Sequence, residues 1–157
     1  MKLKNLRLLP LLLALCLVLA ACGGGGEESK AGVDPAATAQ ALLDSGAFEG
    51  ALDTVDTEVA CQLYGIDYAD VTDGIVYGSL SSGAEEIAIF RFQSTDAAEA
   101  ALSGLEQRVE DQRAALKDYM PEEVAKLDGA IITRLGDSAI LVVAADPDLA
   151  QKTLDAQ

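Results

Sequence analysis

The sequence predicts an α+β fold in which two short N-terminal helices precede a ββαββα unit, with a four-stranded antiparallel sheet and the helices packed on one face of it. Two observations lead to this prediction. Two pairs of apolar segments are each split by a short turn of serine, glycine or aspartate, which is the pattern of a β-hairpin. Each pair is followed by a segment whose apolar residues recur at helical spacing.

Two short helices are expected at the start of the domain. Asp34-Pro35 combines an N-cap acid with a first-turn proline, so a helix should begin there and end at Gly46. A second helix should begin with Asp56 or Thr57 as its cap and end at Gly65. Both helices are small and polar on one side.

Two hairpins are expected to form the sheet. The first joins strands over residues 75–80 and 86–92, and the second joins strands over 130–135 and 139–145. Segment 86–92 is apolar on nearly both faces, which predicts a central strand. The two hairpin–helix units look alike in outline; an internal duplication stays open, but without matched rare residues we favour independent origin.

A long amphipathic helix should follow the first hairpin. Ser94-Thr95-Asp96 provides its cap. Its apolar stripe consists of Leu102, Leu105, Val109, Leu116 and Tyr119. Gln112 interrupts this stripe, and the sequence leaves open whether it marks a binding notch or an exposed turn. Pro121 ends the helix and starts a short one, and Asp146-Pro147 caps the last helix.

The first 21 residues have the order of a secretory signal peptide: basic side chains, an apolar run and then small residues. The apolar run is too short for a membrane-spanning helix. Leu19-Ala20-Ala21-Cys22 resembles the lipobox of bacterial lipoproteins, which predicts a diacylglyceryl group on the Cys22 thiol and cleavage just before that residue. The alternative is an ordinary cleavage site with Cys22 as a bystander, but charge, apolar run and lipobox agree in order and spacing.

Three regions are therefore predicted: a lipoprotein-type signal peptide over 1–21, a lipidated cysteine and flexible glycine-rich tether over 22–33, and a single α+β domain over 34–157. The expected location is the extracytoplasmic face of the cell membrane, with the membrane as a partner through covalent lipid on Cys22.

The charge of the chain limits the classes of partner that it can bind. The sequence has 26 acidic and 11 basic residues, a formal net charge of −15. A strongly anionic surface is repelled by phosphate backbones and by anionic lipid headgroups. We therefore expect no nucleic-acid partner, and we expect the lipid alone to hold the protein at the membrane.

Few catalytic constellations are available to this chain. It contains no histidine and no tryptophan, so a Ser-His-Asp or Cys-His arrangement is excluded. Cys61 is the one cysteine of the predicted domain, which rules out a disulfide within it, and its apolar neighbours favour a core residue over a nucleophile. We predict no catalytic residue and no cofactor.

An aspartate-rich segment, expected to form a turn over 67–74, offers the only metal candidates. Asp67, Asp70 and Asp73 are weak ligands for a hard cation. Their spacing of three does not match the calcium loop of an EF-hand, and residue 80 is a leucine where that loop needs glutamate. Loop solvation and helix capping are the favoured interpretation.

Several stretches of the chain resemble a known family. They are Leu42-Leu43-Asp44-Ser45-Gly46-Ala47-Phe48, Tyr64-Gly65-Ile66-Asp67 running into Ala69-Asp70-Val71, Glu85-Glu86-Ile87-Ala88-Ile89-Phe90, Arg108-Val109-Glu110-Asp111-Gln112, and Pro121-Glu122-Glu123-Val124 before Lys126-Leu127. The family is that of small lipoproteins of anaerobic Gram-positive bacteria carrying the domain of unknown function numbered 4358. The resemblance implies a single extracytoplasmic domain and supplies no activity, ligand or catalytic residue.

The leading functional hypothesis is a non-catalytic, membrane-anchored binding or interaction module of the cell envelope, with an envelope protein as a further partner. The alternative is a module that responds to calcium or magnesium through the acidic loop 67–73. A carboxylate- or Cys61-dependent envelope enzyme ranks third.

Overall fold

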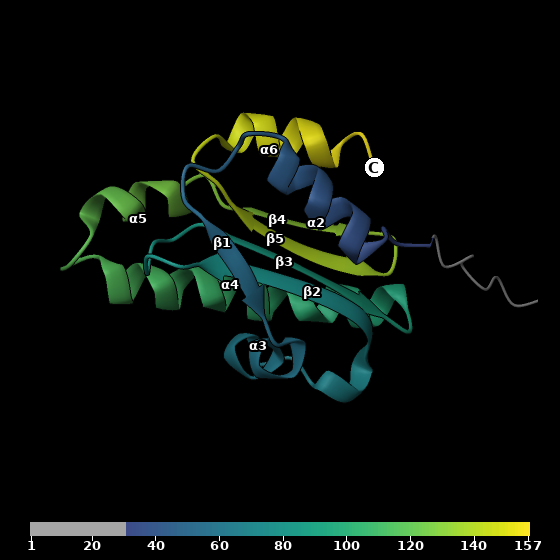
Figure 1. Ribbon diagram of the computed structural model, residues 1–157. Coiled ribbons are helices and arrows are strands. Elements are labelled where there is room, and N and C mark those ends of the chain that lie inside the picture. The colour runs from purple at the N-terminus through teal and green to yellow at the C-terminus, as the bar shows by residue number, and fades with distance from the viewer. Residues whose placement is uncertain (1–30) are drawn as a thin grey trace, which may run out of the picture.

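The computed structural model describes residues 31–157 (Figure 1). The helices are α2 (Pro35–Asp44), α3 (Thr57–Tyr64), α4 (Thr95–Leu116), α5 (Pro121–Leu127) and α6 (Pro147–Leu154), with a 3₁₀ turn over Tyr68–Asp70. The strands are β1 (Leu52–Val55), β2 (Val71–Ser79), β3 (Glu86–Phe92), β4 (Ile131–Leu135) and β5 (Ser138–Val143). The predicted signal peptide, the lipobox residues Leu19, Ala20 and Ala21, and the lipidation site Cys22 lie outside the described residues.

The strands form one antiparallel sheet in the order β1-β2-β3-β5-β4. Both predicted hairpins are confirmed, because β2 pairs with β3 and β4 pairs with β5. The strand over 86–92 is central as expected, since β3 lies between β2 and β5. The α+β class predicted from the sequence is therefore confirmed.

The predicted number of four strands is wrong, because a fifth strand, β1, pairs with β2 at one edge of the sheet. This strand has only four residues, and none of them is fully buried, so its sequence carries no clear alternation. Its partner, β2, follows α3 in the chain, so β1 forms only when segments that are separated in sequence pair with each other. Residues 71–74, expected in a turn, belong to β2 and include an irregularity in its register.

The prediction that the helices share one face is also wrong. Helices α3 and α4 cover one face of the sheet, with α5 packed against α4 at the end of that layer, and α2 and α6 cover the other face, as Figure 1 shows. The physical reason is that β3 and β5 are apolar on both sides: Ala88 and Phe90 face the first group of helices, whereas Ile87 and Ile89 face the second. A strand with two apolar faces must be covered twice.

Helix starts follow the local chemistry of the sequence. The carboxylates of Asp34, Asp56 and Asp146 each accept a hydrogen bond from the backbone N–H three residues later. The hydroxyl of Ser94 does the same for α4. Each cap satisfies one of the N–H groups that a helix start leaves without a partner.

Two residues that precede the predicted domain contact the folded part of the chain. The N–H of Gly32 donates to the Asp137 carboxylate at 2.7 Å, and Val33 packs against the core beneath α2 and α6. Residues 32 and 33 therefore contact the domain, although the sequence placed them in the tether. Within residues 31–157, no helix has both the length and the apolar character needed to cross a membrane.

Candidate functional site

The candidate site lies along the contact between α3 and α4, on the face of the sheet that these helices cover. Gly104 of α4 approaches the carbonyl oxygen of Tyr64 so closely that any side chain at residue 104 would overlap with it. Gly65, in the left-handed conformation at φ 63°, ends α3 immediately after Tyr64. A glycine in each element thus sets where the two helices meet.

Tyr64 is buried at this contact. Its ring meets the ring of Phe90 edge to face, with 5.3 Å between the centroids. The Arg108 guanidinium lies over the same ring, 5.8 Å from its centroid. Packing from the sheet and from α4 therefore orients the tyrosine, whose hydroxyl points at a buried carboxylate.

That carboxylate belongs to Glu86, the first residue of β3, which is only 3 % exposed. Its Oε1 accepts from the Tyr64 hydroxyl and from Arg108 Nε, the latter at 3.2 Å. Its Oε2 accepts from Arg108 Nη2 at 2.8 Å and from Gln112 Nε2. Arg108 and Gln112 reach the same carboxylate because they lie one turn apart on α4. Each carboxylate oxygen therefore has two donors.

Burial dominates the electrostatics of Glu86. Desolvation raises the pKa of its carboxyl above the ordinary value, while the hydrogen bond and charge of Arg108, and then the Gln112 amide, act to lower it. The side chain of Arg108 is itself 25 % exposed. Glu86 thus carries a buried charge beneath α4, and the partner that compensates it, Arg108, still reaches solvent.

Gln112 has an unusual environment. The residue is 8 % exposed, its Nε2 is held by Glu86, and its Oε1 is buried without a hydrogen-bond partner among the described residues. The sequence left Gln112 as either a notch or an exposed turn, and the exposed turn is wrong. A buried acceptor without a donor is unfavourable by about 1–3 kcal/mol.

A groove of about 370 Å³ opens beside Gln112, which we call the hairpin groove because it lies between α4 and the end of the β2–β3 hairpin. Its polar wall contains Glu86, Arg108, Asp111 and Gln112. Its apolar wall contains Val55, Ala115 and Leu116, and its hairpin side includes Gly78, Ser79, Ser82 and Gly83. Ser82 adopts φ 61°, a conformation that non-glycine residues rarely hold and that is found at binding sites more often than elsewhere.

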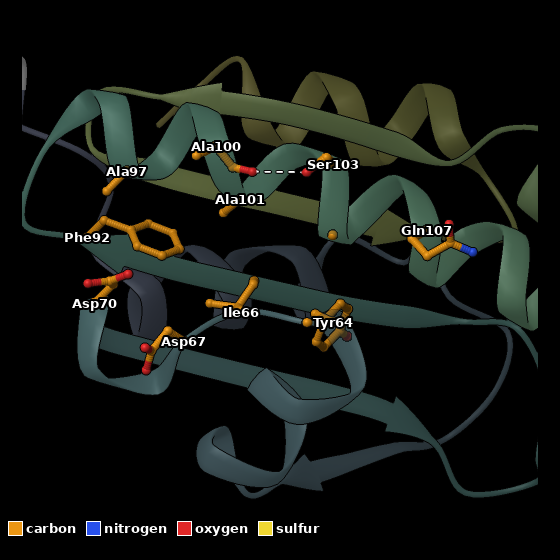
Figure 2. Close-up of a pocket in the computed structure, with 12 residues that line it drawn as sticks. Tyr64, Ile66, Asp67, Asp70, Phe92, Ala97, Ala100, Ala101, Ser103 and Gln107 are labelled. Atoms are coloured by element: carbon orange, nitrogen blue, oxygen red, sulfur yellow. Dashed lines mark hydrogen bonds between the residues drawn. The ribbon is translucent and has the colours of Figure 1, made fainter.

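A second pocket, also of about 370 Å³, opens at the other end of the α3–α4 contact (Figure 2). Small residues of α4, Ala97, Ala100 and Ala101, form one side, and Asp67 and Asp70 lie on the opposite side. Tyr64 lines this α3–α4 pocket and bonds to Glu86, which lines the hairpin groove. The buried network thus connects the two.

The three predicted metal candidates are not gathered at one point. Asp67 caps the 3₁₀ turn by accepting from the Ala69 N–H at 3.0 Å, and Asp73 accepts from the Gly74 N–H at 2.8 Å. Asp67 and Asp70 line the α3–α4 pocket, whereas Asp73 lines a separate, smaller hollow. In the described part of the chain, no group of three or more histidine, cysteine or acidic residues could hold a metal ion.

Cys61 is a core residue, as the sequence favoured. It is buried in the cluster between α3 and the sheet. Burial raises the pKa of its thiol, and the carboxylates of Asp56 and Asp67 raise it further. Such a thiol is poorly suited to act as a nucleophile, because the thiolate is disfavoured.

Sequence reasoning missed both buried glutamates. Glu85 is 2 % exposed and accepts from the N–H groups of Glu49 and Gly50 at 2.9 and 2.7 Å, with Lys126 Nζ at 3.7 Å. It therefore ties the segment before β1 to α5, while Glu86 faces α4. Two adjacent acids at the start of a central apolar strand were the available signal, since such a strand leaves little room for solvated charges.

Comparison with known proteins identifies a family that the chain matches. The model of the domain of unknown function DUF4358 matches residues 44–144, which include both pockets' principal side chains. No curated protein and no solved structure was found to match the chain.

Proposed function

The chain belongs to the DUF4358 family, and from this premise we propose that it is a non-catalytic binding module whose ligand occupies the hairpin groove. We propose further that the module is a bacterial lipoprotein, held at the outer face of the cell membrane by lipid on Cys22. The lipobox motif Leu19-Ala20-Ala21-Cys22 supports the anchor. An envelope protein or a small envelope ligand is the expected partner.

One observation supports the binding role above the others. Gln112 lines the groove, and its Oε1 is buried without a hydrogen-bond partner among the described residues, whereas most buried polar atoms in folded proteins have one. The amide cannot turn away, because its Nε2 is held by Glu86. A ligand that supplies a donor would complete the network.

The state of Glu86 supports binding over catalysis. A carboxylate that acts as a general base needs an oxygen free to take a proton from the substrate. Both oxygens of Glu86 already accept two hydrogen bonds each. The residue is therefore suited to hold Arg108 and Gln112 in place, which is a positioning role.

The cation-responsive alternative lacks a comparable observation. Asp67 and Asp70 share a pocket, but Asp73 lies elsewhere, and two exposed carboxylates are few for a hard cation that prefers six or more oxygen ligands. Calorimetric titration with calcium and magnesium tests it directly, and binding at millimolar affinity or better would restore it.

The anchor is tested by expressing the full chain in a Gram-positive bacterium and measuring its N-terminal mass and membrane association. We expect a diacylglyceryl group on Cys22, and release of the Cys22→Ala variant into the medium. Cys61→Ala is the matched control, since it removes the buried thiol of the domain and leaves the lipobox intact. Equal membrane association of all three forms would refute the anchor.

The binding role is tested in the same cells with a photo-crosslinking amino acid. At Ser82, on the groove, it should yield a discrete adduct; at Gln151, exposed on α6 across the sheet, it should not. Equal labelling from both positions, or none from Ser82, would argue against a ligand in the groove.

A further inference from the structure

We propose that the hairpin groove binds a primary alkylammonium group, such as the end of a lysine side chain or a small free amine. This inference rests on the proposed binding role and adds the chemical class of the ligand. Three features of the groove lead to it: the unpartnered acceptor, the balance of charge among the polar lining residues, and the apolar residues that line the groove beside them.

The acceptor requires a donor from the ligand. Gln112 Nε2 is held on Glu86 Oε2, so the amide plane is set and Oε1 keeps one orientation. A ligand N–H group is the complementary partner, and an ammonium provides three of them on one small centre.

The charge of the groove selects a cation. Arg108 is the one basic side chain that lines the groove, and its Nε and Nη2 both donate to the Glu86 carboxylate. The carboxylate of Asp111 remains, which also accepts from Gln107 on the outer side of α4. The wall therefore has a net negative charge, within a chain of net charge −15. An anionic ligand would be repelled, and a cation would be attracted.

The apolar lining residues suit a short alkyl chain. Val55, Ala115 and Leu116 present methyl and methylene groups to the groove. Gly78 pairs with Glu86 across the β2–β3 ladder, so its missing side chain leaves room on the same face as that carboxylate. A volume of about 370 Å³ accommodates a small ligand or one side chain. An ammonium on an alkyl stem fits both walls at once.

The test is a titration of the full ¹⁵N-labelled chain, purified in detergent, with n-butylamine, n-butanol and sodium butyrate. These probes share the alkyl chain and differ in the head group. We expect saturable shifts of the Gln112 side-chain amide and of the backbone amides of Gly78 and Ser82 with butylamine only, at a Kd of about 1–10 mM.

Two variants locate the effect, and one serves as a control. Gln112→Met removes the acceptor and should weaken butylamine binding about fivefold or more. Gly78→Val fills the groove and keeps the polar network; a Cβ there meets only Val55 Cγ2, at an ordinary 3.4 Å, and binding should be lost. Gln151→Met, on the opposite side of the sheet, should bind as the original chain does.

The outcomes separate this inference from the proposed function. Equal shifts with butanol or butyrate, or unchanged butylamine affinity in Gln112→Met, would refute the proposal of an ammonium ligand and leave the proposal of a binding groove intact. No shift of groove resonances with any of the three probes would count against both proposals. A lysine derivative blocked at both backbone ends, compared with 1,5-diaminopentane, then distinguishes a peptide side chain from a free amine as the source of the group.

Discussion

Replacement of Glu86 by leucine tests the buried network most directly. The substitution removes the acceptor shared by the Tyr64 hydroxyl, the Arg108 guanidinium and the Gln112 amide. Leucine has a similar volume and adds apolar area, so any loss of stability reports on the donors that remain. Tyr64 and Gln112 are almost fully buried, whereas Arg108 can turn toward water.

The expected loss follows from those burials. Each buried donor left without a partner costs about 1–3 kcal/mol, and breaking a buried ion pair by removing one member costs about 3–5 kcal/mol. Because Arg108 is a quarter exposed, its share is reduced. We expect Glu86→Leu to lower the free energy of unfolding by about 3–4 kcal/mol, which is a large part of the stability of an ordinary domain.

A double-mutant cycle isolates the ion pair. Arg108→Met leaves Glu86 buried with two neutral donors, and the combined Glu86→Leu/Arg108→Met variant leaves no uncompensated charge. We expect the double variant to be more stable than the sum of the two single losses predicts, by about 2 kcal/mol. The free energies are measured by urea unfolding followed by far-UV circular dichroism.

Two results would refute this reasoning. A loss below about 1 kcal/mol for Glu86→Leu would mean that the donors find other partners and that the network contributes little. Additive losses in the cycle would mean that Glu86 and Arg108 act independently, against the geometry of two hydrogen bonds between them.

Three further predictions concern the same face of the sheet. Because burial above all raises the pKa of Glu86, the folded chain holds that proton more tightly than the unfolded chain; its contribution to stability is full below the ordinary glutamate pKa and is lost as pH rises through the raised one. The stability of the original chain should therefore fall relative to that of Glu86→Gln as pH rises in urea titrations, and a difference that stays constant would contradict the raised pKa. Gly104→Ala should destabilise the fold by about 1–2 kcal/mol in thermal unfolding, because overlap with the Tyr64 carbonyl outweighs a helix-propensity gain of about 0.5–1 kcal/mol. Ser103→Ala, on the same helix, should not destabilise it. Stabilisation by both substitutions would contradict the close contact. Alkylation of Cys61 by iodoacetamide, followed by peptide mass spectrometry, should be about a thousandfold slower in buffer than in urea, since it needs unfolding, and a fast reaction in buffer would show the thiol to be accessible.

Much of the fold was predictable because its signals are local. Hairpins β2–β3 and β4–β5 follow from short polar turns between apolar segments, and the cap of α4 lies within the predicted Ser94-Thr95-Asp96. The strand over 86–92 was correctly placed at the centre. Its two apolar faces also required helices on both sides of the sheet, a consequence that the single-faced prediction overlooked.

The candidate site was less predictable than the fold. Gln112 drew attention as a gap in an apolar stripe, but its partner could not be named, because Glu86 lies 26 residues earlier on a strand. In the sequence, nothing distinguished Glu86 from the other acidic residues of a chain that has 26 in all. The aspartates of segment 67–74 looked more promising in sequence, yet Asp67 caps a 3₁₀ turn and Asp73 lies in β2, where it accepts from the N–H of the next residue.

The sequence by itself determined the helix starts, the two hairpins, the mixed α+β class and the predicted lipobox, because each depends on residues within a few positions of one another. Tertiary structure alone decided the edge strand β1, the division of helices between two faces and the network at Glu86. The donors to that carboxylate come from 22 residues before it and from 22 and 26 residues after it. Whether a charged side chain is solvated or buried depends on what packs over it, and only the folded chain brings α3 and α4 over β3.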